Sequence, residues 1–332
     1  MKILTKSLLI PCFLLLTCVF HNGTAVAGME DLNYKAEKQI NLMDAWGTSS
    51  TDVFAVGNWG TIIHYDGSTW SEMDSGTTNT YEGVWGTSST DVFVVNGTTI
   101  LHYDGTGWIE IDRDTGKFMH DIWGTSSSDV FVADVAGILY FDGTEWSKFD
   151  IFPSWVYSGV WGTSSTDVFA VGNLGKIMHY DGTLWTEMES GSDIGLGGVW
   201  GTSSNDVFTV GSNTIIHYDG TSWSAMDGAE GKVLQGVWGS SSTDVYAVGL
   251  DGAMIHYDGS GWSDVNTGSL NSLEDIWGTS ANNIFAVGSK IILHYDGSNW
   301  TEMDIAHILA ADEPSDDDDD DDDDDTDGNE TT

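Results

Sequence analysis

One pattern of apolar and polar positions repeats seven times along the chain. The segment WGTSSTDVFAVGNWGTIIHYDGSTWSEM begins at Trp46 and recurs, with substitutions, at intervals of 38 or 39 residues. The later copies begin at Trp85, Trp123, Trp161, Trp200, Trp238 and Trp277. Self-similarity at this period is typical of repeat architectures, in which each unit buries its surface against its neighbours. The pattern within one repeat therefore predicts the fold of the whole array.

Within each repeat, short apolar runs alternate with turn signals, which predicts four β-strands. One strand leads into the Trp-Gly pair, as at 196–200, and the others correspond to 52–57, 62–65 and 70–73. Asp-Gly between the last two strands is a hairpin signal, because both residues tolerate the positive φ of such turns. No window shows a sustained helical period.

Four antiparallel strands in about 38 residues, repeated seven times, predict an all-β fold, a seven-bladed β-propeller. The propeller is expected to span 42–304, with the ring closed by packing of the first blade on the seventh. Every blade then contains four strands of its own repeat. The lead segment, 28–41, is a candidate for adding to this closure.

The N-terminal residues 1–27 have the features of a secretory signal peptide. Two lysines precede an apolar run over 8–20, and Ala27 ends a small-x-small cleavage site. The run of 13 residues is too short to span a membrane. A lipoprotein signal at Cys18 is the less favoured alternative, because threonine is a poor residue before a lipidated cysteine. We therefore expect a secreted protein, extracellular or periplasmic, whose mature chain contains no cysteine.

The C-terminal residues 305–332 are expected to form a disordered acidic tail. They include an unbroken run of ten aspartates at 316–325, whose mutual repulsion opposes folding. A solvated spacer is the favoured interpretation. Weak Ca²⁺ binding by these carboxylates is the alternative, and no other cofactor is expected.

The composition excludes several classes of partner. Ten Lys and Arg residues stand against 52 Asp and Glu residues, giving a formal net charge of −42. A protein this acidic repels phosphate backbones and anionic lipids. We therefore expect neither nucleic acid nor a membrane as a partner. Arg113 is the only arginine, so no multi-arginine clamp for a sugar acid can form.

The pieces HYDGSTW and WGTSSTDVFAVG resemble the Asp-box (bacterial neuraminidase) class of propeller repeats. They are especially similar to the Trp-Gly-Thr-Ser repeat arrays of secreted bacterial proteins. The resemblance covers 42–304, although Asp-Gly-x-x-Trp is one residue shorter than the Ser-x-Asp-x-Gly-x-Thr-Trp pattern. It implies a propeller fold. The family includes glycosidases, lectins and assembly factors, so it implies little about activity.

Residues that recur in every repeat point to structural roles. Asp52 and its counterparts are expected to cap turn amides, and a ring of Ca²⁺ sites is the disfavoured alternative. A histidine precedes the third-strand tyrosine in six repeats, one in each of six blades, which favours structural histidines over metal ligands. These histidines are His64, His102, His179, His217, His256 and His294, with Tyr140 in the third repeat.

The loops between repeats and between the second and third strands vary in chemistry and share one face of the propeller. Aromatic rings beside hydrogen-bonding groups suit a sugar ring. The candidate ligand-binding residues on this face are Trp59, Tyr81, Glu82, Arg113, Lys117, His120, Asp121, Trp155, Tyr157, Glu274 and Asp275. The alternative interpretation is that these are ordinary exposed loop residues on a scaffold that binds no ligand at this face.

Two functions follow from this pattern. The first is a monomeric, non-catalytic recognition or scaffold propeller that binds a glycan or an extracytoplasmic protein through the variable face. The second is a glycoside hydrolase acting on a neutral sugar, which would pair Asp44, Asp121 or Asp275 with Glu82 or Glu274. Sialidases of the class that the repeats resemble need three arginines for the substrate carboxylate, so the single arginine, Arg113, excludes that activity. Because propeller enzymes build their pockets from long loops and no repeat carries an insertion, we expect a protein that is not an enzyme.

Overall fold

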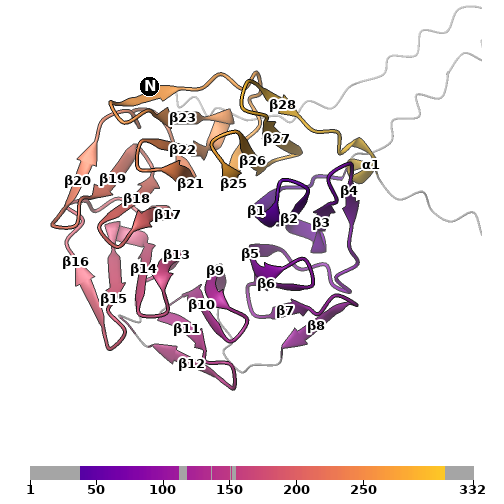
Figure 1. Ribbon diagram of the computed structural model, residues 1–332, viewed down its shortest axis with the longest axis horizontal. Coiled ribbons are helices and arrows are strands. Elements are labelled where there is room, and N and C mark those ends of the chain that lie inside the picture. Colours follow the sequence, from indigo (N-terminus) through magenta and orange to yellow (C-terminus); the bar gives the residue numbers. More distant parts are fainter. Residues whose placement is uncertain (1–37, 112–117, 136, 150, 152–154, 311–332) are drawn as a thin grey trace, which may run out of the picture. The chain divides into compact units, whose positions relative to one another are not determined.

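The structure is a computed structural model that describes residues 38–111, 118–135, 137–149, 151 and 155–310. Seven four-stranded antiparallel sheets form the blades of a β-propeller, which confirms the predicted fold and blade number (Figure 1). In each sheet the four strands follow one another in sequence order, from the centre of the ring outward. Each blade is thus complete within its own repeat.

The strand bounds repeat with the sequence. The innermost strands are β1 (Leu42–Ser49), β5 (Tyr81–Ser88), β9 (Met119–Ser126), β13 (Tyr157–Ser164), β17 (Leu196–Ser203), β21 (Leu234–Ser241) and β25 (Leu273–Ser280). The second strands are β2 (Asp52–Gly57), β6 (Asp91–Asn96), β10 (Asp129–Asp134), β14 (Asp167–Gly172), β18 (Asp206–Gly211), β22 (Asp244–Gly249) and β26 (Asn283–Gly288).

The third strands are β3 (Ile62–Tyr65), β7 (Ile100–Tyr103), β11 (Gly137–Phe141), β15 (Ile177–Tyr180), β19 (Thr214–Tyr218), β23 (Met254–Tyr257) and β27 (Ile291–Tyr295). The outer strands are β4 (Trp70–Glu72), β8 (Trp108–Ile111), β12 (Trp146–Phe149), β16 (Trp185–Met188), β20 (Trp223–Met226), β24 (Trp262–Asp264) and β28 (Trp300–Glu302). The short helical elements are the 3₁₀ turns η1 (Asn58–Gly60), η2 (Asn173–Gly175) and η3 (Leu250–Gly252), and the helix α1 (Ala306–Leu309).

The core lies between neighbouring blades. In β2, every residue after Asp52 is buried, because successive side chains pack on the blade before and the blade after. Phe54 and Val56 pack with Val84 and Val94 of the second blade, and the same type of apolar cluster recurs around the ring. Burial of both sheet faces therefore depends on the adjacent blades, as expected for a repeat architecture.

The recurring Trp-Gly pair has a direct packing reason. A Cβ atom added to Gly86 would lie 2.8 Å from the Trp46 ring of the preceding blade and 2.6 Å from the Asp91 carbonyl oxygen. The glycine of each blade faces the first tryptophan of the preceding blade in the same way. These glycines are Gly47, Gly86, Gly124, Gly162, Gly201, Gly239 and Gly278. The pair thus sets the spacing between the innermost strands.

The repeated aspartate and histidine form a network within each blade. The Asp52 carboxylate accepts a hydrogen bond from the Thr48 hydroxyl and lies 2.7 Å from Nε2 of His64, whose ring stacks on Phe54. This pattern recurs in most blades, with Asn283 replacing the aspartate in the seventh. The histidines thus take part in structural contacts within the sheets.

The expectation that Asp52 caps turn amides is corrected by this network. That role belongs to Asp66, whose Oδ1 accepts hydrogen bonds from the amides of Ser68 and Thr69 at 2.8 and 2.9 Å. The Ser68 hydroxyl and both amides lower the pKa of the exposed Asp66 carboxyl to about 2. Asp52 instead lies where it meets the hydroxyl and imidazole groups of its own sheet.

Residues from both ends of the described chain cover the seam between the seventh and first blades. The Ile40 carbonyl accepts a hydrogen bond from the Lys290 amide at 2.9 Å, and Asn41 forms a β-bridge with Ser289. From the other end, Nε2 of His307 in α1 lies 2.8 Å from the Trp70 carbonyl oxygen. Residues 38–41 of the predicted lead segment thus contribute to the ring closure, and 28–37 lie outside the described residues.

The expectation that disorder begins at residue 305 is wrong for 305–310. Ile305 and Ile308 are 4% and 2% exposed, and both pack in the cluster that contains Leu42 and Trp70. Burial of these two side chains favours the ordered conformation despite the acidic sequence that follows. The signal peptide at 1–27 and the remaining tail at 311–332 lie outside the described residues. Within the described ranges, no helix has the length and apolar character needed to cross a membrane.

Candidate functional site

Two kinds of loop open on the same face of the propeller, because the strands of each blade alternate in direction. These are the loops between blades and the turns from the second to the third strand of each blade. We call this surface the loop face. The opposite surface, which carries the turns between the first and second strands and between the third and fourth, is the turn face. The variable sequence positions lie on the loop face.

A cavity of about 240 Å³, here named the funnel, lies where the innermost strands begin on the loop face. Each blade contributes the third residue before its Trp-Gly pair. These residues are Met43, Glu82, His120, Ser158, Gly197, Gln235 and Glu274. The next position adds Asp44, Asp121 and Asp275 to the lining. The structure therefore brings together five of the predicted site residues, Glu82, His120, Asp121, Glu274 and Asp275.

The three funnel aspartates bind the backbone of the following blade. Oδ2 of Asp44 accepts a hydrogen bond from the Val84 amide at 2.6 Å. Oδ2 of Asp121 accepts one from the Val160 amide at 2.8 Å, and Asp275 reaches the first blade in the same way. These carboxylates link adjacent innermost strands across the blade interfaces.

Burial in the funnel raises the pKa of each of these carboxyls. The pKa of Asp121 rises to about 8, mainly through burial and further through the charge of Asp44. Burial raises the pKa of Asp275 to about 6. The pKa of Asp44 also lies well above its usual range, because of burial and of the charge on Asp275. The funnel thus contains carboxyls that bind protons more tightly than in the unfolded chain.

This proton binding predicts a pH-dependent stability. A carboxyl whose pKa is raised on folding stabilises the protein at low pH, and that contribution is lost as pH rises through the folded-state pKa. The loss begins near the unfolded-state pKa of about 4 and ends as pH passes the folded-state pKa, which is about 6 for Asp275 and about 8 for Asp121. We expect the free energy of unfolding to fall across this window, by up to about 1.4 kcal/mol per pH unit for each titrating group.

Urea unfolding at successive pH values checks this expectation. Asp121→Asn removes one titrating group, so its unfolding free energy should fall less steeply with pH than that of the wild type. Asp66→Asn is the matched control, because the pKa of Asp66 is lowered to about 2 and the group does not titrate in this window. Equal slopes for wild type and Asp121→Asn would contradict the pKa assigned to Asp121.

The two funnel glutamates differ in their contacts. Glu274 accepts hydrogen bonds from the side-chain amides of Gln235 and Asn41, the latter at 3.2 Å. Burial and the charge of Glu274 raise the pKa of Glu82, and burial lowers the pKa of His120. No lysine or arginine lines the funnel among the described residues. The funnel is therefore a locally acidic pocket.

The predicted aromatic candidates divide into buried and exposed rings. Tyr81 and Tyr157 are fully buried, so the expectation that they present rings to a ligand is wrong. Their hydroxyls bond Thr77 Oγ1 and the Ile151 carbonyl within the protein. Both occupy the first position of an innermost strand, where Leu42, Met119, Leu196, Leu234 and Leu273 stand in the other blades. That alternation with leucine and methionine is the sequence signal for a core position.

The remaining candidates lie apart from the funnel. Trp155 is half-buried, and Nζ of Lys176 lies 4.4 Å from its ring centroid. Trp59 is 69% exposed and lies in η1, where its φ of 60° is in the left-handed region. Arg113 and Lys117 lie outside the described residues. The predicted site is therefore not one continuous cluster.

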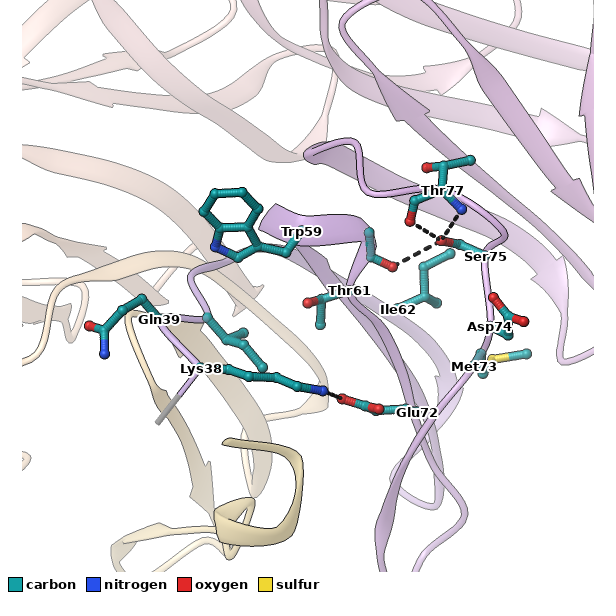
Figure 2. A pocket seen from close by; sticks show the side chains of 12 residues that line it. Lys38, Gln39, Trp59, Thr61, Ile62, Glu72, Met73, Asp74, Ser75 and Thr77 are labelled. Carbon is teal, nitrogen blue, oxygen red and sulfur yellow. Dashed lines mark hydrogen bonds and ion pairs between the residues drawn. The ribbon is translucent and has the colours of Figure 1, made fainter. Parts of the chain in front are cut away.

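Trp59 lies beside a groove of about 770 Å³ on the first blade, shown in Figure 2. The groove runs between η1, the start of the described chain and the residues from Glu72 to Thr77. Lys38 Nζ and a Glu72 carboxylate oxygen lie 3.2 Å apart across it, and the Ser75 hydroxyl donates to the Gly60 carbonyl at 3.0 Å. The groove has an apolar ring at its edge and polar groups along its wall.

Exposed apolar side chains other than Trp59 are the feature that sequence reasoning missed. In the part of the chain that the structure describes, eight large apolar side chains are exposed. Six belong to loops of the loop face, namely Trp59, Phe118, Leu174, Ile194, Leu250 and Leu270. Leu184 lies on the turn face and Ile109 on the outer strand β8. In the described residues, exposed large apolar side chains are thus more numerous on the loop face than on the turn face.

Comparison with known proteins shows the fold and no more. No protein-family model matches the chain, and a search of curated proteins finds no match. Among solved structures, YCF48 bound to a D1 peptide aligns with a TM-score of 0.65 at 15% identity, covering 78% of this chain and 94% of that one. The Asp-box resemblance of the repeats stays a prediction.

Two further structures show the same similarity. YCF48 from Cyanidioschyzon merolae aligns with a TM-score of 0.65 at 13% identity and covers 79% of this chain and 97% of that one. The WD40 β-propeller domain of Doa1 aligns with a TM-score of 0.67 at 10% identity, covering 78% and 93%. The chain is thus a seven-bladed β-propeller, and these identities are too low to transfer a function.

Proposed function

We propose that this chain is a non-catalytic recognition propeller that binds another protein through its loop face. The observation that carries the proposal is the concentration of exposed apolar side chains on that face, most of all Leu270 at 86% exposure and Leu174 at 59%. Removing such side chains from water on binding contributes about 25 cal/mol per Å². One of the similar structures, YCF48, is bound to a peptide, which supports the proposal by analogy of fold alone.

The sequence of residues 1–27 supports a role outside the cytoplasm. We propose export through the signal peptide at 1–27, with an extracellular or periplasmic protein as the partner. The acidic tail would act as a solvated spacer, with weak Ca²⁺ binding as its alternative role.

The hydrolase alternative has weaker support. Its acid and base would come from the funnel, yet Asp44, Asp121 and Asp275 accept hydrogen bonds from backbone amides of the next blade. These hydrogen bonds give the three carboxylates a structural role, so a catalytic role is not needed to explain their positions. The funnel volume of about 240 Å³ also lies below the range of about 300–1,000 Å³ typical of small-molecule sites.

Carbohydrate binding remains the second candidate because of one observation. The exposed Trp59 ring stands at the edge of the first-blade groove, whose wall carries the carboxylates of Glu72 and Asp74. A flat ring beside hydrogen-bonding groups suits the apolar face and hydroxyl rim of a sugar. Selective glycan binding that is lost in Trp59→Ala and retained in Leu174→Ser would favour this candidate over protein binding.

A displayed random-peptide library tests the protein-binding proposal. Peptides are selected on the wild-type protein, and their affinities are then measured for Leu174→Ser, Leu270→Ser and, as the turn-face control, Leu184→Ser. We expect each loop-face change to weaken binding by about tenfold, and the control to leave it unchanged. Enrichment of no peptides, or of peptides sensitive only to Leu184→Ser, would overturn the proposal.

A further inference from the structure

Exposed aliphatic side chains of the loop face lie on two pairs of neighbouring loops. In the fourth blade, the turn η2 that carries Leu174 abuts the loop that carries Ile194, since a Cβ atom on Gly175 would lie 2.1 Å from the Ser192 carbonyl oxygen. In the sixth blade, a Cβ atom on Gly252 would lie 3.0 Å from the Cα atom of Leu270. The turn η3 that carries Leu250 thus abuts the loop that carries Leu270.

We call Leu174, Ile194, Leu250 and Leu270 the apolar arc. The arc spans the blades from the fourth to the loop before the seventh, on the face where the funnel opens. Exposed aliphatic side chains at two separate positions suit a ligand that is long enough to reach both, with apolar side chains of its own. An extended peptide segment has this form.

The negative charge of the protein indicates that the bound peptide is cationic. The chain has a formal net charge of −42, so its field attracts cationic segments and repels anionic ones. The funnel on the same face is lined by Asp44, Glu82, Asp121, Glu274 and Asp275, with His120 as its only basic side chain among the described residues. A surface with such charge selects partners of complementary charge and speeds their encounter.

From these observations, and resting on the proposed function, we propose the chemistry of the partner. The loop face docks an extended segment that places apolar side chains on the apolar arc and inserts one basic side chain, lysine or arginine, into the funnel. A volume of about 240 Å³ suits a single side chain rather than a folded element. A bound metal ion is a poorer fit, because no group of three or more acidic, histidine or cysteine side chains is arranged to hold one in the described residues.

Proton binding in the funnel supports this assignment. A cation favours the ionised form of a neighbouring carboxyl, so a basic side chain should displace protons from the funnel. The affected carboxyls line the same cavity and include Asp121, whose pKa is raised to about 8. Burial lowers the pKa of His120, which favours the neutral form of its ring. We expect affinity for a basic peptide to increase as pH rises from about 6 to about 8.

The test uses peptides selected from the displayed library on the full-length protein. The tightest peptide is synthesised in two forms, one with its basic residue and one with norleucine in its place. We expect the norleucine form to bind at least about tenfold more weakly to the wild type. The double variant Glu82→Gln with Glu274→Gln should lose the same factor for the basic form and nothing for the norleucine form. Glu302→Gln, an exposed carboxylate of β28, is the control and should change neither affinity.

The outcomes separate this inference from the proposed function. One outcome is that the peptides bind Leu270→Ser more weakly but lack a basic residue, or bind the double glutamate variant as tightly as the wild type. This outcome would overturn the funnel assignment and leave the proposal of protein binding by the loop face intact. Failure of every peptide to depend on the apolar arc would overturn both. A thermal melt of the double variant that matches the wild type shows that the fold is retained in each comparison.

Discussion

Removal of residues 305–332 is expected to destabilise the propeller far more than removal of 311–332 alone. The longer deletion exposes the seam between the seventh and first blades, because it removes the buried side chains of Ile305 and Ile308. Burial of such side chains contributes about 1.5–3 kcal/mol each, so a loss of about 3–6 kcal/mol is expected. This loss is a large part of the free energy of unfolding of a typical folded domain, which is about 5–15 kcal/mol.

Equilibrium unfolding in urea of the two truncated chains and the full chain measures this difference. The chain ending at Ala310 retains α1, including the contact of His307 with the Trp70 carbonyl and that of the Lys38 amide with the Leu309 carbonyl. Its stability should equal that of the full chain. Equal stability of all three chains would show that the seam does not depend on residues 305–310.

The second large effect is expected for Gly86→Ala. Its added Cβ atom would lie 2.6 Å from the Asp91 carbonyl oxygen and 2.8 Å from the Trp46 ring, both held within the packed ring of innermost strands. Overpacking of a core typically costs about 1–3 kcal/mol, and two close contacts with groups that have little room to move favour the upper end. We expect a loss of about 3 kcal/mol in the free energy of unfolding.

The matched control for this change is Gly107→Ala, because a Cβ atom at Gly107 would meet no atom within 4 Å. It should leave the stability close to that of the wild type. Chemical unfolding of both variants gives the comparison. A smaller loss for Gly86→Ala than for Gly107→Ala would contradict the account of the repeated Trp-Gly pair as the spacer between blades.

The fold could be predicted because each of the seven repeats carries the same four-strand pattern. The second-strand run from Asp52 to Gly57 predicts a strand buried on both faces, and the later repeats restate this pattern at equivalent positions. The closure of the ring is different, since the segments at 38–41 and 305–310 occur once and have no repeat to indicate their pairing. Their contacts arise only when the first and last blades meet.

The candidate site could be predicted in part. The third position before each Trp-Gly pair varies, and the ring symmetry brings Glu82, His120 and Glu274 together at its centre. The same reasoning was wrong for Tyr81 and Tyr157, because a position in the interior was interpreted as a loop position. The sequence does not indicate the apolar arc, because single aliphatic residues in polar loops carry no periodic signal, and only the three-dimensional arrangement shows that they share a face.

The location of the bound peptide tests the central claim most directly. A photoreactive amino acid is placed at position 270 on the loop face in one variant and at position 184 on the turn face in another, since both leucines are exposed. A peptide selected on the wild-type protein is then cross-linked and identified by mass spectrometry. The account predicts a cross-link from position 270 and none from position 184, whereas a cross-link from position 184 alone would contradict it.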